Sequence, residues 1–297
     1  MLTVNELFSG IGAFRKALIN LKIPHQIVGI SEIDKWAIKS YNAIYGETRN
    51  YGDITKVGKL DYADMWTYGF PCQDISVVGK QAGLVKGVTK SGLLYEVQRL
   101  LEVSREQNEL PKYLILENVK HLVCVKFRPA FDGWLEYLDS IGYNTYWRVL
   151  NAMDYGIPQR RERLFAVSIR KDIDHGFEFP EKIPLTVRFS DLLEENPDPK
   201  CFIANRTLRS INDHNERQRA KGNHFFNDVR KREDWDVYNT LTSVPNRGSG
   251  GGVYRRIRIV YRSLENWIST LLITVRESIA QKGYAQQLQA AWGGITK

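Results

Sequence analysis

The sequence predicts an α/β fold in which a largely parallel sheet is covered by helices on both faces. In the first 180 residues, apolar runs of strand length alternate with longer amphipathic stretches, a pattern typical of strand–helix–strand units. A Gly-x-Gly pair also stands where the first predicted strand meets the first predicted helix. The chain has 297 residues, which allows two domains or one large α/β domain with an insertion.

The predicted elements follow one another in a regular order. Period-2 and period-3.6 apolar patterns separate them into strands and helices. Strands are expected at 4–8, 26–30, 64–66, 113–116, 143–150 and 163–169, and helices at 13–20, 36–45, 93–105 and 131–140. The last two strands are expected to pair with each other.

Composition excludes several classes of protein. Hydrophobic residues make up 43% and charged residues 26% of the chain, which is ordinary for a globular protein and excludes a collagen-like or wholly disordered one. The sequence shows neither a long apolar run nor a signal-peptide pattern, so we expect no membrane association. Three scattered cysteines do not suit a disulfide framework or a zinc cluster, so we expect no metal and a cytoplasmic location.

The excess of positive charge is concentrated in one region. The chain has a net charge of +8, of which residues 186–262 carry +5. Basic runs there, such as Arg230-Lys231-Arg232, alternate with aromatic residues and a glycine-rich loop at 247–252. Basic and aromatic side chains on loops suit phosphate contacts and base stacking, so the region favours a nucleic-acid partner. A solvated linker is the alternative interpretation.

The residues after the first two predicted strands suit an adenosine-containing ligand. Gly10 and Gly12 let the backbone approach a ligand, and the following helix N-terminus offers N–H donors. Glu32 follows the second strand, where a carboxylate can accept hydrogen bonds from ribose hydroxyls. Asp53 can accept a hydrogen bond from an adenine amino group. Plain turn glycines and helix-capping carboxylates are the alternatives.

The segment Gly-Phe-Pro-Cys-Gln at 69–73 gives the sharpest local sign of chemistry. Cys72 is nucleophilic once deprotonated, and Pro71 fixes the backbone before it. A small buried hydrophobic residue is the alternative interpretation of Cys72, and it is the one we adopt for Cys124 and Cys201.

Charged residues also stand at the ends of two later strands. Glu117 follows the apolar strand at 113–116, and the carboxyl ends of parallel strands line the ligand crevice. Arg161 and Arg163 are two positions apart at the start of the last predicted strand, so both are expected to point the same way, toward a substrate phosphate or base. A helix cap for Glu117 and a solvated edge for the arginines are the alternatives.

Six segments, in this order, resemble the sequential motifs of the DNA cytosine-5 methyltransferases. They are Glu-Leu-Phe-Ser-Gly-Ile-Gly-Ala-Phe at 6–14, Glu-Ile-Asp at 32–34, Gly-Asp-Ile at 52–54, Gly-Phe-Pro-Cys-Gln at 69–73, Glu-Asn-Val at 117–119 and Gln-Arg-Arg-Glu-Arg at 159–163. Together they span about residues 1–170. The resemblance implies a Rossmann-like S-adenosylmethionine-dependent methyltransferase fold with a smaller target-recognition domain.

The resemblance also implies a role for each matching residue. Cys72 is expected to attack C6 of cytosine, Glu117 to hold the base and supply a proton at N3, and Arg161 and Arg163 to secure the flipped base. S-adenosyl-L-methionine is the expected cofactor, bound by Phe8, Gly10, Ile11, Gly12, Glu32, Ile33, Asp53, Ile54 and Pro71.

Domains and partners follow from the same resemblance. A catalytic domain is expected at 1–185, a target-recognition domain at 186–262 and an atypical helical tail at 263–297. Double-stranded DNA is the expected partner, the chain is expected to act as a monomer, and a companion restriction endonuclease suits the family.

The tail departs from the family pattern. It contains neither the Gly-Phe block nor the Gln-x-Gly-Asn-Ser block of the family, although helix-like runs occur at 271–281 and 285–292. The hypothesis is that this segment is degenerate, frameshifted or truncated, which predicts reduced activity. A catalytically impaired DNA-binding relative is therefore one alternative function. An RNA cytosine-5 methyltransferase is another, because that branch shares the Cys and the Glu-Asn-Val.

Overall fold

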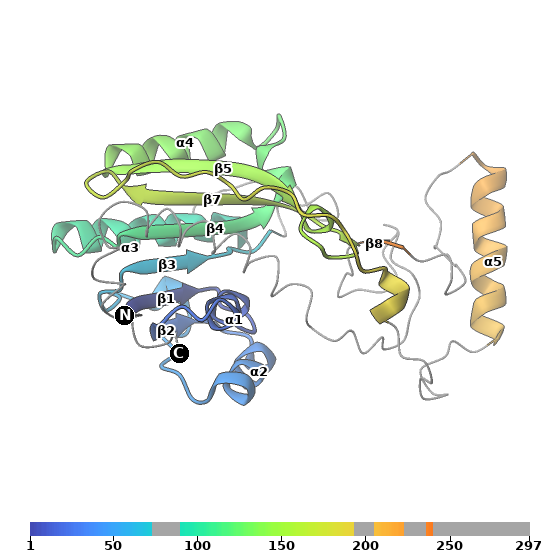
Figure 1. Ribbon diagram of the computed structural model, residues 1–297, viewed down its shortest axis with the longest axis horizontal. Helices are drawn as coiled ribbons and strands as arrows, with labels where there is room; N and C mark the ends of the chain where they lie inside the picture. Colours follow the sequence, from blue (N-terminus) through green and yellow to red (C-terminus); the bar gives the residue numbers. More distant parts are fainter. Residues whose placement is uncertain (73–89, 193–204, 223–235, 240–297) are drawn as a thin grey trace, which may run out of the picture. The chain divides into compact units, whose positions relative to one another are not determined.

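The computed structural model describes residues 1–72, 90–192, 205–222 and 236–239 (Figure 1). Within these residues the chain forms two compact units. The first contains Met1–Leu150 and Glu162–Glu181, and the second contains Asn151–Arg161 together with the described residues from Lys182 onward. The domain limits at 185 and 262 stay predictions.

A six-stranded sheet forms the first unit, in the order β2-β1-β3-β4-β7-β5 (Figure 1). Its strands are β1 (Leu2–Leu7), β2 (His25–Ser31), β3 (Met65–Tyr68), β4 (Tyr113–Val119), β5 (Tyr143–Asn151) and β7 (Glu162–Arg170). The first four are parallel to one another, and β7 runs antiparallel to β4. The predicted mostly parallel sheet is confirmed, as is the pairing of the last two predicted strands.

Helices join the strands where the sequence predicts them. They are α1 (Ala13–Asn20), α2 (Lys35–Tyr45), α3 (Leu94–Glu106) and α4 (Arg128–Ser140). Local chemistry sets two of the starts. The Asp34 carboxylate caps α2 by accepting the N–H groups of Trp36 and Ala37 at 2.8 and 3.0 Å. Pro129 lies in the first turn of α4, where its missing N–H costs nothing.

The core lies on both faces of the central strands. Leu114 and Leu116 of β4 join one large cluster with apolar residues of α3 and α4. Side chains alternate between faces along a strand, so the intervening Ile115 points to the opposite face, where it is also fully buried. Burial on both faces explains why this strand is a continuous apolar run.

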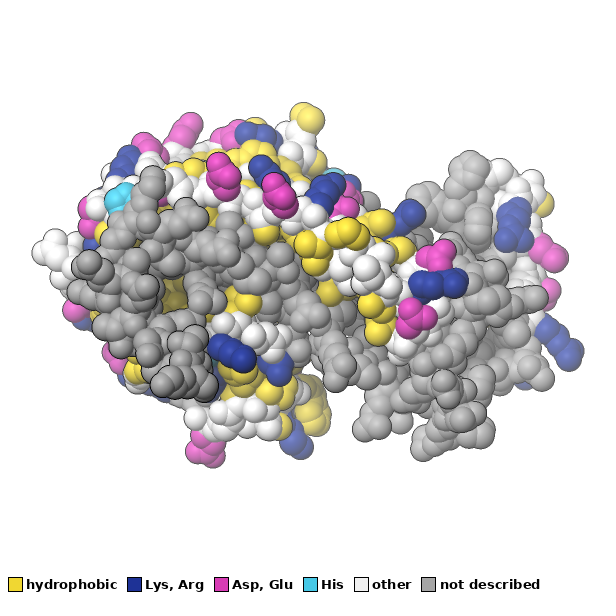
Figure 2. Space-filling view, viewed as in Figure 1, with side chains coloured by type: hydrophobic (Ala, Val, Ile, Leu, Met, Phe, Trp, Pro, Cys, Tyr) yellow, Lys and Arg dark blue, Asp and Glu magenta, His cyan; other side chains and the backbone are white. Residues whose placement is uncertain are grey.

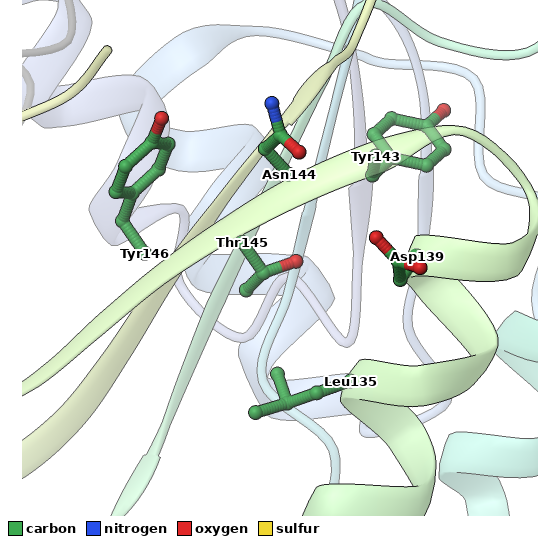
Figure 3. Close-up of a pocket in the computed structure, with 6 residues that line it drawn as sticks. All are labelled: Leu135, Asp139, Tyr143, Asn144, Thr145 and Tyr146. Carbon is green, nitrogen blue, oxygen red and sulfur yellow. The ribbon is translucent and has the colours of Figure 1, made fainter.

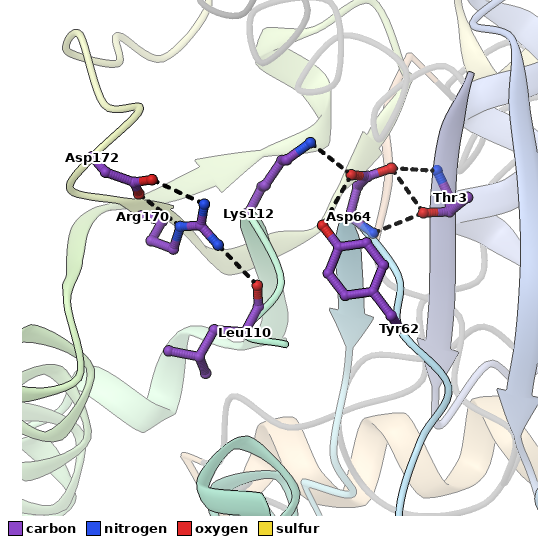
Figure 4. Close-up of polar contacts among 7 residues, drawn as sticks. All are labelled: Thr3, Tyr62, Asp64, Leu110, Lys112, Arg170 and Asp172. Carbon is purple, nitrogen blue, oxygen red and sulfur yellow. Dashed lines mark hydrogen bonds and ion pairs between the residues drawn. The ribbon is translucent and has the colours of Figure 1, made fainter. Parts of the chain in front are cut away.

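A polar network ties the amino ends of the strands together (Figure 4). The Asp64 carboxylate accepts hydrogen bonds from the Thr3 backbone and hydroxyl at 3.0 and 2.7 Å, and pairs with Lys112 Nζ at 2.9 Å. Burial pushes the pKa of Asp64 up, but the hydrogen bonds from Lys112 and Thr3 outweigh burial and leave the pKa below its ordinary value. Asp64 therefore favours the folded state as a carboxylate.

We expect Asp64→Asn to lower the free energy of unfolding by about 1–3 kcal/mol at pH 7, because the Lys112 and Thr3 donors lose a charged acceptor. A lowered folded-state pKa gives stability above the ordinary value of 3.8 that is lost as pH falls through the folded-state value. The difference between wild type and variant should therefore shrink in acid. Denaturant titrations at several pH values measure it.

Asp172→Asn is the matched control, because Asp172 pairs with Arg170 while its side chain remains 58% exposed. A surface pair of this kind contributes about 0–1 kcal/mol. Equal losses in the Asp64 and Asp172 variants would contradict the role given to the Asp64 network.

The described part of the second unit is smaller and more polar. It holds a parallel pair, β6 (Gln159–Arg160) with β8 (Tyr238–Asn239), and the helix α5 (Asn205–Ala220). Helix α5 buries Ile211 and Asn215 and exposes several arginines and acidic residues, so charges of both signs reach the surface there (Figure 2). The basic run 230–232, the loop 247–252, Cys201 and the whole predicted tail lie outside the described residues.

The described residues contain neither a membrane-spanning helix nor a candidate metal site. No helix there is long and apolar enough to cross a membrane. In the same part of the chain, no group of three or more His, Cys, Asp and Glu side chains is placed to hold a metal ion.

Candidate active site

The parallel strands bring most of the predicted motifs to one edge of the sheet. The register aligns Leu7 of β1 with Ser31 and Tyr68, the last residues of β2 and β3. Tyr68 in turn pairs with Leu116 of β4. The residues that come next along the chain, Phe8, Glu32, Gly69 and Glu117, all belong to predicted motifs, so four of these motifs meet at this edge.

The Gly-x-Gly turn after β1 has an unusual backbone. Phe8, Gly10 and Gly12 all have positive φ, at 56°, 56° and 82°. A Cβ added to Gly10 would meet no atom within 4 Å, so the space beside the turn is open. Gly12 is the N-cap of α1 and offers no side-chain cap. The turn therefore presents backbone groups and the start of a helix to that space.

Glu32 holds this turn with its carboxylate. Its Oε2 accepts the Gly10 N–H at 2.8 Å, and its Oε1 accepts the N–H groups of Ile33 and Asp34, each at 2.9 Å. A carboxylate has about four acceptor positions, so capacity remains for a ligand hydroxyl. The neighbouring Ile33 side chain is 74% exposed, which leaves an apolar surface beside the carboxylate.

Asp53 and Ile54 also have local structural roles. The Asp53 carboxylate accepts the Thr55 hydroxyl and N–H at 2.8 and 3.0 Å and caps the short helix η1 (Ile54–Lys56). Those hydrogen bonds, the hydroxyl one first, lower the pKa of Asp53. Ile54 is 3% exposed and belongs to the core. The capping alternative for Asp53 is thus observed, and a ligand role for either residue stays a prediction.

Two side-chain donors hold the carbonyl groups just before Cys72. Asn118 Nδ2 donates to the Phe70 carbonyl at 3.0 Å, and Ser91 Oγ, in the short helix η2 (Lys90–Leu93), donates to the Pro71 carbonyl at 2.8 Å. Cys72 itself is half-buried and packs against the core cluster. The backbone leading into the thiol is therefore fixed from two directions. Residues 73–89 lie outside the described part of the chain.

Glu117 lies between the Pro-Cys segment and an arginine. Arg163 Nε pairs with Glu117 Oε1 at 3.1 Å, and the two side chains are only 16% and 25% exposed. On the other side, a Cβ added to Gly69 would lie 3.6 Å from Glu117 Oε2. The antiparallel register of β4 and β7 sets Glu117 opposite Phe165 and Val119 opposite Arg163, so Glu117 and Arg163 are diagonal neighbours on one face of the sheet. The structure thus brings Glu117, Arg163 and the segment ending in Cys72 together.

Arg161 is placed differently from the prediction. It lies in the break between β6 and β7, since β7 begins only at Glu162. Its backbone is held by Asn151, whose Oδ1 accepts the Arg161 N–H at 3.0 Å. The expectation that Arg161 and Arg163 point the same way by strand alternation was therefore wrong in its premise, because no single strand contains both.

Several supporting residues were not singled out from the sequence. Asn118 stands inside a recognised motif, but its bond to Phe70 depends on two strands lying side by side. No sequence pattern marked Ser91 as a supporting residue. Glu6, a charged residue inside an apolar strand, was the one visible sign of the partly buried cluster described below.

A hollow of about 490 Å³ lies between α4 and the start of β5 (Figure 3). Its lining residues are Leu135, Asp139, Tyr143, Asn144, Thr145 and Tyr146. Asn144 and Tyr146 both donate to Asp174, and Thr145 donates to Ser168. The hollow contains none of the predicted site residues, and these polar groups already bond within the protein.

Comparison with known proteins identifies the family. A family model described as C-5 cytosine-specific DNA methylase matches residues 2–288. The type II methyltransferase M2.ScrFI of Lactococcus lactis subsp. cremoris is 38% identical, with 70% of this chain and 72% of that protein covered. The type II methyltransferase M.NlaX of Neisseria lactamica is 35% identical, with 76% and 70% covered.

A solved structure agrees at the level of the fold. The S. pombe Dnmt2 methyltransferase superposes with a TM-score of 0.61 at 20% identity, covering 91% of this chain and 82% of that one. The predicted methyltransferase fold is thereby confirmed. With the family model matching most of the sequence, the chain belongs to the C-5 cytosine-specific DNA methylase family.

Proposed function

We propose that the chain transfers a methyl group from S-adenosylmethionine to C5 of a flipped cytosine in duplex DNA, through a covalent bond to Cys72. The hydrogen bond between Asn118 and the Phe70 carbonyl is the observation that carries the proposal. It joins the strand bearing Glu117 to the segment bearing Cys72, so the two proposed reacting groups share one rigid support. The proposal agrees with the family and with the type II methyltransferase relatives.

The residues at the first strand ends fit the proposed cofactor. The open space at Gly10 leaves room for a ligand against the backbone, Glu32 keeps acceptor capacity for ribose hydroxyls, and exposed Ile33 offers an apolar surface to adenine. When bound, S-adenosylmethionine supplies an electrophilic methyl group on its sulfonium. The proposed binding set is Phe8, Gly10, Ile11, Gly12, Glu32, Ile33, Asp53, Ile54 and Pro71.

C5 of cytosine is a poor nucleophile, and a covalent bond from the enzyme to C6 would activate it. The Cys72 thiolate would form a bond to C6 of the base while Glu117 delivers a proton to N3. The ring electrons would then move toward C5, which becomes enamine-like and would form a bond to the methyl group as the methyl–sulfonium bond breaks and leaves a neutral thioether. The C5 proton would pass to water, the C6–S bond would break to release the Cys72 thiolate, and the N3 proton would return to Glu117, which restores the aromatic ring.

The arginines would orient these groups. Arg163 pairs with the Glu117 carboxylate and would fix its direction toward the base. We assign Arg161 to securing the base by resemblance alone. Because C5 and C6 lie inside the stacked duplex, the base must be extruded to reach Cys72.

The remaining predictions concern the rest of the chain. The proposed target-recognition domain at 186–262 would contact duplex phosphates and base edges with its basic residues. Neither alternative function, an RNA methyltransferase or an impaired relative, is favoured by the relatives found. The match of the family model extends through residue 288, into the segment proposed to be degenerate. Action as a monomer and a companion endonuclease also remain proposals.

The test uses the purified chain, labelled S-adenosylmethionine and two substrates, duplex genomic DNA and transfer RNA. We expect label in the DNA alone, and bisulfite sequencing of the product should show methylated cytosines in one short sequence context. Label in the transfer RNA alone, or in neither substrate, would contradict the proposal.

A further inference from the structure

A partly buried polar cluster supports the Gly-x-Gly turn from outside the predicted site. We call it the β1–α2 cluster: Glu6 on β1, Arg15 on α1, and Tyr41 and Tyr45 on α2. The family resemblance assigned none of these side chains a role. Each is bonded to the turn, to the first turn of α1, or to another member of the cluster.

Glu6 is the centre of the cluster and is 1% exposed. Its Oε1 accepts the Arg15 N–H at 3.0 Å, and its Oε2 accepts the Tyr41 hydroxyl at 2.5 Å. Burial raises the pKa of Glu6 to about 7, although both hydrogen bonds act in the opposite direction. A carboxyl group at this depth is costly unless bonded, and its bonds tie the start of α1 to α2.

Tyr45 reaches the turn directly, because its hydroxyl donates to the Gly12 carbonyl at 2.7 Å. A Cβ added to Gly12 would lie 2.5 Å from Tyr45 Cε2 and 2.6 Å from Tyr41 Cε2, so both rings are packed hard against the turn. The Arg15 guanidinium lies 4.7 Å from the Tyr45 ring centre, which holds that ring in place.

Helix α2 thus connects two parts of the proposed cofactor site. It begins just after Glu32, which holds Gly10, and it ends at Tyr45, which holds Gly12. Gly10 is therefore held by a residue three positions before the helix begins, and Gly12 is held by the last residue of the helix. A shift of either end would change the direction of the backbone groups that face the ligand.

We propose that Tyr45 is a positioning residue for the cofactor, and that its bond to Gly12 sets the turn on which S-adenosylmethionine binds. The inference rests on the proposed function, since it concerns the same ligand. It predicts that Tyr45 influences cofactor affinity without touching the reacting groups. Glu6 and Tyr41 would act through the same contact, by holding α2 against α1.

The test is Tyr45→Phe, which keeps the ring and removes only the hydroxyl. We expect the Kd for S-adenosylmethionine, measured by calorimetry, to rise roughly 3- to 10-fold for the loss of one hydrogen bond. The kcat at saturating cofactor and the Kd for duplex DNA should stay unchanged. Tyr146→Phe is the matched control, because it removes one hydroxyl bond, to Asp174 at 2.8 Å, on the edge strand β5.

Glu6→Gln is a second test. The Tyr41 and Arg15 donors bond to different oxygens of Glu6, and the amide replaces one of these oxygens with an NH2 group that cannot accept. The variant should show the same rise in cofactor Kd with unchanged DNA binding. An unchanged cofactor Kd in Tyr45→Phe would overturn the positioning role. So would a rise in cofactor Kd that is accompanied by an equally large weakening of DNA binding and a lowered Tm. A wild-type chain that binds no S-adenosylmethionine would instead overturn the proposed function, and the inference with it.

Discussion

Cys72→Ala is expected to reduce methyl transfer by at least about 10,000-fold while leaving duplex DNA binding intact. The proposed reaction cannot begin without a bond to C6, and alanine offers no atom to form it. DNA affinity rests on phosphate and base contacts, to which one thiol adds little. Transfer of labelled methyl groups into DNA, together with a binding titration at fixed salt, measures both quantities.

The structure provides a close control for this experiment. Cys124 is the second half-buried cysteine among the described residues and also packs against the core cluster. Cys124→Ala removes the same atom, so it should keep the methyl-transfer rate within a few-fold of wild type. Near-normal transfer by Cys72→Ala would refute the nucleophile assignment, and an equal loss in both variants would point to damaged packing instead.

The effect of Cys72 depends on its backbone support. Asn118 and Ser91 hold the carbonyls of the two preceding residues, and Ser91 is fully buried. Catalysis by a positioned nucleophile is sensitive to displacements near 1 Å, so we expect these two donors to position the thiol without reacting themselves.

Much of the first unit could be predicted because local pattern and tertiary structure agree there. The continuous apolar run of β4 reflects burial on both faces, and the Gly-x-Gly pair marks a turn with positive φ. Parallel strands also end at a common edge, so the positions of Glu32 and Glu117 after two predicted strands were enough to predict that both lie at the carboxyl edge of the sheet. The weak strand expected at 64–66 is β3 at Met65–Tyr68.

The remaining features depend on contacts between distant residues. No local pattern reveals that the Asn118 amide meets the Phe70 carbonyl or that the Tyr45 hydroxyl meets Gly12, because these partners are 48 and 33 positions apart. For Arg161, a local rule was applied at a position where it does not hold. The alternation rule is correct for a strand, but the strand begins one residue too late for the rule to include Arg161.

Glu117→Gln is expected to lower kcat by about 100- to 10,000-fold, the range typical of losing a general acid. Glutamine keeps the size of the side chain and can still accept a hydrogen bond from the base, but it cannot deliver a proton to N3. The Kd values for S-adenosylmethionine and DNA should change little, so the loss should appear in kcat. Single-turnover assays with saturating DNA and cofactor measure it.

Glu162→Gln is the matched control, because Glu162 is an exposed glutamate that pairs with Lys120 near the same edge of the sheet. Its ion pair lies in solvent, so kcat should stay near the wild-type value.

Arg163→Ala separates chemistry from orientation, because it leaves the Glu117 carboxyl group in place but removes its partner. If Glu117 is the acid and Arg163 its positioning partner, Arg163→Ala should lower kcat less than Glu117→Gln, and the double variant should resemble Glu117→Gln alone. Additive losses would show that the two residues act independently and that the ion pair has no catalytic purpose.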